Sequence, residues 1–150
     1  MTPPVVSPAK RTQGSCRCGR VRYAIGTPIA PATMCHCRSC QKIAGAHAVA
    51  WLTVPLETWE ILCGSTNAFR SAEHVERQFC SQCGSPLTYW SASSPVTIDI
   101  TVATLDHPDE YPPEDHIWME DALSWDHPND GLACHPRERT RKSPTTIGTV

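Results

Sequence analysis

Seven of the nine cysteines fall into three short clusters whose spacing suits metal binding. The clusters are residues 16–19 (CRCG), 35–40 (CHCRSC) and 80–84 (CSQCG). Cytosolic thiols are kept reduced, and an odd number of cysteines cannot all pair, so a framework of disulfides explains this pattern poorly. Ligation of metal ions by thiolates is the better interpretation.

The first and third clusters both end in Cys-Gly, a sequence typical of a metal-binding knuckle. Glycine at this point permits a positive φ, which directs backbone N–H groups toward the thiolates. Two facing knuckles would complete a tetrahedral four-thiolate site, the arrangement of many structural zinc ions, with Zn–S distances near ~2.3 Å. We therefore predict a structural zinc that closes the β region and leaves no room for substrate, held by Cys16, Cys18, Cys80 and Cys83.

The middle cluster supplies three thiolates, Cys35, Cys37 and Cys40, with no evident fourth ligand. Three protein ligands and one open position are how catalytic zinc is bound, and a thiolate-rich zinc suits a thiol substrate. Two other arrangements stay open: a histidine such as His36 could close the site, or the cysteines could form a metal-free redox trio. Because His36 lies between two ligands, we expect it to point away from their metal.

Segments of alternating apolar and polar residues surround the clusters and predict strands. The clearest is 96–102 (VTIDITV), which has the period of a half-buried strand. Further strands are expected at residues 21–25, 48–54, 59–63, 68–70, 75–79 and 87–90, with one short helix at 39–46. We therefore predict an all-β fold of short antiparallel strands, with loops that carry the cysteines.

The length of 150 residues suits one domain, which we place at residues 14–136. Residues 1–13 are Pro-rich and predict a disordered lead-in, and residues 137–150 predict a loose basic tail. Outside the clusters, Cys63 is expected to be a small buried residue and Cys134 an incidental thiol. Trp118 and Trp125 should pack against the domain.

The bulk composition argues against some classes of binding partner. A formal net charge of −2 gives no field that would recruit nucleic acid or an anionic membrane, and no apolar run approaches the ~20 residues of a membrane span. The first residues lack the basic start and apolar stretch of a signal peptide. We therefore expect a cytoplasmic protein that does not associate with membranes. The composition is compatible with a homodimer.

Three segments, 14–23, 35–46 and 79–87, closely resemble the glutathione-dependent formaldehyde-activating enzyme family, which includes the centromere protein V and S-(hydroxymethyl)glutathione synthase relatives. The order and spacing of all three motifs match, and the resemblance extends from about Gly14 to about Pro136. It implies a β-tent fold with two Zn²⁺ per chain. The structural ion maps onto the first and third clusters, and the catalytic ion onto the middle cluster.

The resemblance also implies a reaction, the condensation of glutathione with formaldehyde to S-hydroxymethylglutathione by a carbon–sulfur lyase. The thiolate of glutathione, or of a related thiol, would occupy the open zinc position and attack a small aldehyde, and a nearby donor would protonate the new alkoxide. Since glutathione is an anion, Arg38 and Lys42 beside the middle cluster are candidate substrate-binding residues.

Two other functional classes compete with this enzyme. One is a non-catalytic zinc module that binds protein or nucleic acid. Its contact surface would be formed by the basic tail together with Arg11, Arg17, Arg20 and Arg22. The acidic overall balance and the lack of a long basic arm count against it. The other is a redox or metal-trafficking protein, in which the middle cysteines would oxidise reversibly.

Overall fold

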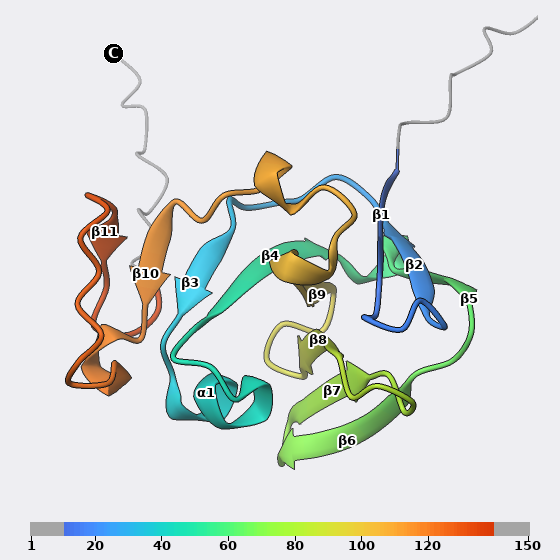
Figure 1. Ribbon diagram of the computed structural model, residues 1–150, viewed down its shortest axis with the longest axis horizontal. Coiled ribbons are helices and arrows are strands. Elements are labelled where there is room, and N and C mark those ends of the chain that lie inside the picture. The colour runs from blue at the N-terminus through green and yellow to red at the C-terminus, as the bar shows by residue number, and fades with distance from the viewer. Residues whose placement is uncertain (1–10, 140–150) are drawn as a thin grey trace, which may run out of the picture.

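Two β-sheets dominate residues 11–139, the part of the chain that the computed structural model describes (Figure 1). The smaller sheet has the order β1-β2-β5 and the larger β11-β10-β3-β4-β9-β8-β7-β6. The strands are β1 (Thr12–Ser15), β2 (Arg22–Ile25), β3 (Thr33–Cys35), β4 (Val49–Pro55), β5 (Glu60–Cys63), β6 (Asn67–Ala72), β7 (Val75–Phe79), β8 (Pro86–Ser91), β9 (Thr97–Thr101), β10 (Asp115–Ile117) and β11 (Ala133–Cys134). The prediction of a mainly β fold is confirmed.

The predicted strands are all present, and their ends lie within two residues of the expected positions. Four further strands, β1, β3, β10 and β11, had no alternating pattern to reveal them. β10 pairs in parallel with both β3 and β11, so the expectation of purely antiparallel strands is wrong at this edge. The reason is that β10 joins β3 across a long connection, whereas hairpins would force antiparallel pairing.

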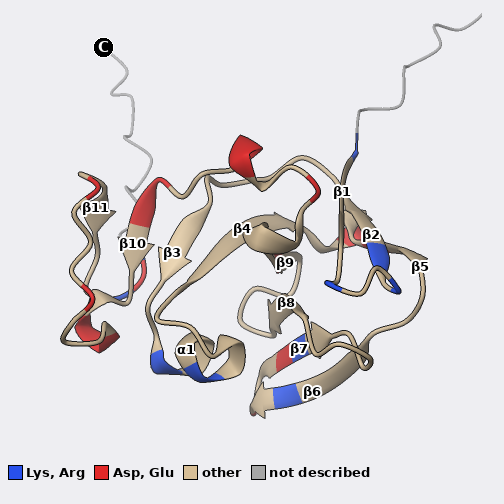
Figure 2. Ribbon diagram, viewed as in Figure 1, with Lys and Arg blue, Asp and Glu red and all other residues tan. Residues whose placement is uncertain are grey.

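Charged side chains are unevenly distributed over the described residues (Figure 2). Lysine and arginine colour α1 (Arg38–Ala44) and parts of β6 and β7 along one edge of the molecule, where β7 also carries an acidic residue, and further basic residues lie at β1 and β2. Acidic residues gather mainly on two 3₁₀-helices and near β10. Those 3₁₀-helices are η3 (Pro108–Glu110) and η4 (Met119–Asp121). The basic edge is also the side on which the middle cysteine cluster lies, because Cys40 belongs to α1.

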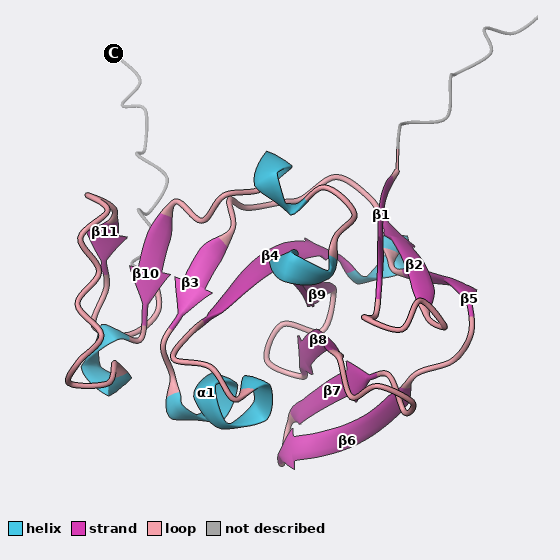
Figure 3. Cartoon of the chain, in the orientation of Figure 1, coloured by secondary structure: helices cyan, strands magenta, loops and turns pink. Residues whose placement is uncertain are grey.

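The helices are short and lie in the connections between strands (Figure 3). Besides α1, η3 and η4, the described part of the chain contains η1 (Leu56–Thr58) and η2 (Val102–Thr104). The helix α1 begins because Cys37 Sγ accepts a hydrogen bond from the Cys40 backbone N–H at 3.3 Å, and it ends at Gly45 in the left-handed conformation. Within residues 11–139, no helix has the length and apolar character needed to cross a membrane.

Strand β4 separates two apolar clusters because its side chains alternate between the faces of the sheet. Leu52 and Val54 join the main core with Tyr23 and Ile100. Trp51 points to the opposite face, where it packs with Cys35, Cys40 and the partly buried Trp118. The middle cysteine cluster therefore has its own apolar support, distinct from the main core.

Residues just outside the predicted bounds of 14–136 also make contacts with the domain. Residues 1–10 and 140–150, most of the expected lead-in and tail, are outside the described part of the chain. Thr12 already belongs to β1, and Arg139 donates hydrogen bonds to both carboxylate oxygens of Asp115, a buried residue of β10. The described domain therefore includes positions that the sequence had placed in both flanking segments.

Candidate metal centres

The first and third cysteine clusters come together as predicted. The Sγ atoms of Cys16, Cys18, Cys80 and Cys83 all lie within 4.8 Å of one another. Cys16 and Cys18 are 3.5 Å apart, and Cys18 and Cys80 are 3.8 Å apart. These separations exceed the ~2.05 Å of a disulfide, and they match the ~3.8 Å expected between sulfurs that share a tetrahedral zinc. The donor set therefore fits a four-thiolate metal ion.

Each knuckle has the geometry that its glycine predicts. Gly19 and Gly84 both have φ +76°, and each donates its backbone N–H to the carbonyl oxygen of the first cysteine of its cluster. The Val21 N–H lies 3.3 Å from Cys16 Sγ. Since one knuckle joins β1 to β2 and the other joins β7 to β8, a bound ion would tie the small sheet to the large one.

Cys35, Cys37 and Cys40 form the second centre, with their Sγ atoms within 4.8 Å of one another. Cys35 ends β3, Cys37 caps α1, and Cys40 lies in its first turn. Hydrogen bonds from the Cys35 and Cys40 thiols lower the pKa of Cys37 to about 2, and the Cys40 N–H and the charge of Arg77 act in the same direction. The hydrogen bonds with Cys37 and Cys40 raise the pKa of Cys35, so the trio by itself favours one thiolate, at Cys37, and the positive charge of a metal ion would favour the other two.

Within residues 11–139, no other histidine, cysteine or carboxylate completes this trio. His36 lies between two of its cysteines in sequence, but its ring turns away: Nε2 is 2.9 Å from His116 Nδ1. The predicted orientation of His36 is therefore what the structure shows. Three protein ligands leave one position for another group, which is the arrangement of catalytic rather than structural zinc.

A cavity of about 670 Å³ lies next to the trio: none of the three cysteines lines it, but Arg77, which the sequence analysis did not select, does. Its lining includes Trp51, which packs on Cys35 and Cys40, and Ile43 of α1. The sheet register sets Arg77 opposite Phe69 of β6 on one side and Tyr89 of β8 on the other, on one face of the sheet. A volume of this size suits a ligand as large as a small peptide.

The Arg77 guanidinium is buried but incompletely paired. Arg77 is only 4% exposed, with its Cζ 4.9 Å from the Tyr89 ring centroid. Nε donates to Ser71 Oγ, Nη2 lies 4.0 Å from Cys40 Sγ, and Nη1 has no hydrogen-bond partner. A buried donor without a partner is costly, so this geometry favours an anionic ligand in the cavity. Arg77 lies two residues from both Val75 and Phe79 in the sequence, so a strand places the three side chains on the same face. This spacing was the feature of the sequence that could have revealed Arg77.

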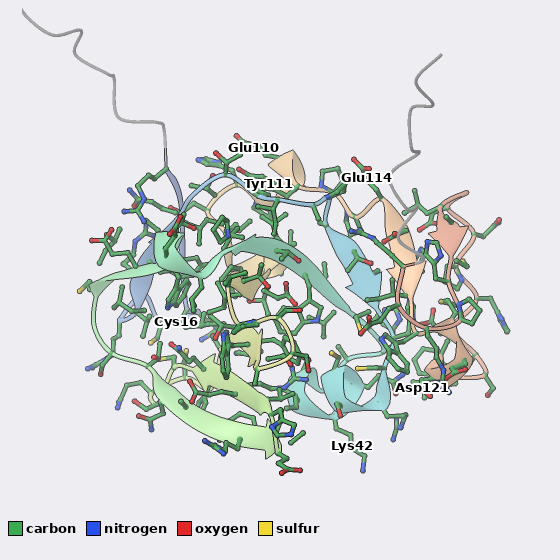
Figure 4. All side chains as sticks on the ribbon, turned by 180° about the vertical axis from the view of Figure 1, so that it is seen from behind. Cys16, Lys42, Glu110, Tyr111, Glu114 and Asp121 are labelled. Carbon is green, nitrogen blue, oxygen red and sulfur yellow. The ribbon has the colours of Figure 1, made fainter. Side chains whose placement is uncertain are left out.

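The two substrate-binding residues predicted from sequence lie elsewhere. Arg38 and Lys42 are exposed on α1, and neither lines the cavity. Figure 4 shows the Lys42 side chain extending away from the rest of the molecule, and Arg38 donates to Gln41. Their role in binding stays a prediction, whereas Arg77 is already placed at the cavity.

Four secondary expectations have mixed outcomes. Trp118 packs beside the trio as expected, but Trp125 is 67% exposed. Cys63 is exposed, not buried, because it ends an edge strand, and Cys134 is an exposed thiol.

Of the arginines proposed to contact nucleic acid, Arg11 pairs with Glu60 and Arg22 pairs with Asp106 at 2.7 Å. These ion pairs reduce the free positive charge of that surface.

The fold and the two thiol clusters define a mainly β protein with cysteine centres that could hold metal ions. A sequence model described as glutathione-dependent formaldehyde-activating enzyme matches residues 11–121, and the chain belongs to this family. A Halomonas elongata protein named "Putative glutathione-dependent formaldehyde-activating enzyme" is 30% identical over 122 residues, which cover 75% of this chain and 78% of that protein.

A solved structure supports the fold independently. The crystal structure of a Rhodobacter sphaeroides protein superposes with a TM-score of 0.55, covering 82% of this chain and 98% of that one. The two sequences are only 19% identical, so this likeness concerns the fold alone.

Proposed function

We propose that this chain is a zinc-dependent carbon–sulfur lyase that joins glutathione, or a related thiol, to formaldehyde or another small aldehyde. The observation that carries the proposal is the incomplete trio of Cys35, Cys37 and Cys40 beside a cavity that contains the buried cation Arg77. Family membership supports the same reaction. The four-cysteine cluster would hold a second, structural zinc.

The trio and Arg77 have complementary charges. Zinc bound by three thiolates would take the substrate thiol as a fourth ligand and favour its ionised form. The Arg77 guanidinium, 4.0 Å from Cys40 Sγ, would offset the negative charge that four sulfurs accumulate. Its unpaired Nη1 remains available to a carboxylate of the substrate.

The reaction balances without an oxidant or a reductant. The substrate sulfur forms a bond to the carbonyl carbon, and the π electrons of the C=O bond move to oxygen. That oxygen then takes one proton, which gives the S-hydroxymethyl product. The work left to the protein is to ionise the thiol, hold it beside the aldehyde and exclude competing orientations.

The apolar part of the cavity suits the remainder of a thiol tripeptide. Phe69 and Phe79 line it, with ring centroids 5.8 Å apart, and Trp51 of β4 lines it as well. Apolar walls with a few placed polar groups are typical of small-molecule sites. The cavity therefore offers packing for a peptide backbone and one strong electrostatic anchor.

Exchange NMR on glutathione and formaldehyde tests the proposal, because the uncatalysed adduct also forms. We expect the zinc-loaded protein to accelerate interconversion of free and adduct glutathione, and Cys37→Ser to abolish the acceleration. Cys134→Ser, which removes an exposed thiol outside both clusters, is the matched control and should leave the rate unchanged. Equal rates with the wild type and Cys37→Ser would refute the proposal.

A further inference from the structure

A third cluster of potential metal ligands contains none of the cysteines of the two centres described above. His36 Nδ1, His47 Nδ1 and an oxygen of Asp126 all lie within 4.8 Å of one another. Asp126 Oδ2 is 3.0 Å from His36 Nδ1 and 2.8 Å from His47 Nδ1. The proposed enzyme activity makes no use of these three side chains.

A chain of hydrogen bonds determines which nitrogen of His36 carries the proton. Asp130 Oδ2 lies 2.9 Å from His116 Nε2, and His116 Nδ1 lies 2.9 Å from His36 Nε2. A carboxylate only accepts, so His116 donates from Nε2, and in the neutral form of His116 the Nδ1 atom is the acceptor for the His36 Nε2–H. His36 Nδ1 is thereby left with a lone pair directed away from His116.

A second acceptor, the carboxylate of Asp126, lies close to His36 Nδ1. His36 is 1% exposed, and its Nδ1 makes no hydrogen bond of normal geometry although Asp126 Oδ2 is only 3.0 Å away. The geometry therefore leaves a fully buried ring nitrogen beside the half-buried carboxylate without a well-formed hydrogen bond. A cation bound by both groups would satisfy them together.

We propose that His36, His47 and Asp126 bind one divalent transition-metal ion, zinc or a metal of similar ligand preference. Two imidazoles and one carboxylate are a common ligand set for such ions, and the relay from His36 through His116 to Asp130 matches the outer hydrogen bonds that orient ligating histidines. Ligand atoms now 2.8–3.0 Å apart need to separate only slightly, toward ~3.3 Å, to share a tetrahedral zinc.

His47 makes the site accessible. Its side chain is 52% exposed, and its ring lies 6.1 Å from that of the exposed Trp125. Solvent can therefore move its proton to Nε2 and free Nδ1 for the ion, which would enter from this side. A bound ion would connect His36, which lies between two cysteines of the trio in the sequence, to the loop that contains Asp126.

Equilibrium dialysis against buffered Zn²⁺, followed by elemental analysis, tests the proposal. We expect the reduced wild-type protein to bind one more ion per chain than His47→Ala at the same free zinc concentration. Because His47 is exposed, its replacement should leave the fold intact. His74→Ala, which removes a 67% exposed histidine that belongs to none of the three ligand clusters, is the matched control and should keep the full complement.

A second pair of variants separates this ion from those at the cysteines. Asp126→Asn should remove the same single ion, and Asp130→Asn should weaken its binding by about 10–100-fold through the relay. With Co²⁺, this ion should add ligand-field absorption without the thiolate charge-transfer band of the cysteine sites. Equal zinc content and affinity in the wild type and His47→Ala would overturn the proposal, whatever the outcome of the glutathione assay.

Discussion

Arg77 Nη2 lies 4.0 Å from Cys40 Sγ, so a buried guanidinium of β7 directly approaches the cysteine trio of β3 and α1. These residues are 37 positions apart in sequence. The only buried arginine among the described residues therefore lies next to the centre that we propose to be catalytic. It also gives the activity a testable dependence on the charge of the substrate.

Replacing Arg77 should impair the binding of anionic thiols more than that of neutral ones. For Arg77→Gln, we expect the apparent KM for glutathione to rise about tenfold or more, because a charge-assisted hydrogen bond of roughly 1.5–3 kcal/mol is lost. The KM for the uncharged thiol 2-mercaptoethanol should change much less. Arg70→Gln, on the exposed part of β6, is the control. A uniform loss with both thiols would instead indicate a structural role.

The two cysteine centres should bind metal independently. We expect two zinc ions per chain at the cysteines, a folded Cys37→Ser protein that loses one of them, and a Cys83→Ser protein that is destabilised, because its ion ties two sheets together. Elemental analysis of protein purified under reducing conditions, with circular dichroism for folding, measures both effects. Cys63→Ser should retain both ions. Full zinc retention in Cys37→Ser would contradict a metal at the trio.

Gly84 should be sensitive to substitution through its backbone alone. Its φ is +76°, and an added Cβ would meet no atom within 4 Å, so Gly84→Ala introduces conformational strain without a clash. We expect a loss of about 1–2 kcal/mol in the free energy of unfolding of the zinc-loaded protein. Gln82→Ala, in the same turn without a positive φ, should change stability by less than about 0.5 kcal/mol. Similar unfolding midpoints in urea would count against this account of the knuckle.

The ion pair between Asp115 and Arg139 should make part of the stability depend on pH. Burial opposes the ionisation of Asp115, but hydrogen bonds from Arg139 and Thr33 outweigh it and lower the pKa of the carboxyl group. A lowered folded-state pKa contributes stability that is complete above the unfolded-state pKa of about 3.9 and is lost as the pH falls through the folded-state value. Arg139→Ala should therefore lower the free energy of unfolding by about 1–3 kcal/mol at pH 7.

The pH series distinguishes this charge effect from simple packing. The difference between wild type and Arg139→Ala should persist from pH 7 to 5 and narrow below about pH 4. Arg137→Ala, which breaks a more exposed pair with Glu120, should cost no more than about 1 kcal/mol. A difference for Arg139→Ala that did not change with pH would show that its contacts with backbone carbonyls, and not its charge pair, matter.

Local sequence determined several strands, the two Cys-Gly knuckles and the cysteine trio because each depends on a short-range pattern, whereas the meeting of the two knuckles, 62 positions apart at Cys18 and Cys80, needed the fold. Alternation of apolar and polar residues placed β9, and the Cys-Gly knuckles required the positive φ seen at Gly19 and Gly84. Three thiolates spaced within six residues can meet without help from the rest of the chain. The cytoplasmic location, the homodimer and the roles of Arg38 and Lys42 stay predictions.

Only the tertiary structure decided what surrounds the centres. Strand β10 is three residues long and pairs in parallel across 82 positions, as in Asp115 opposite Thr33, so no local pattern could place it. The same pairing brings His116 to His36, and the register of β6, β7 and β8 sets Arg77 in the cavity. Strand order and register result from burying the whole core at once, which is why a single sequence showed the ligands but not their neighbours.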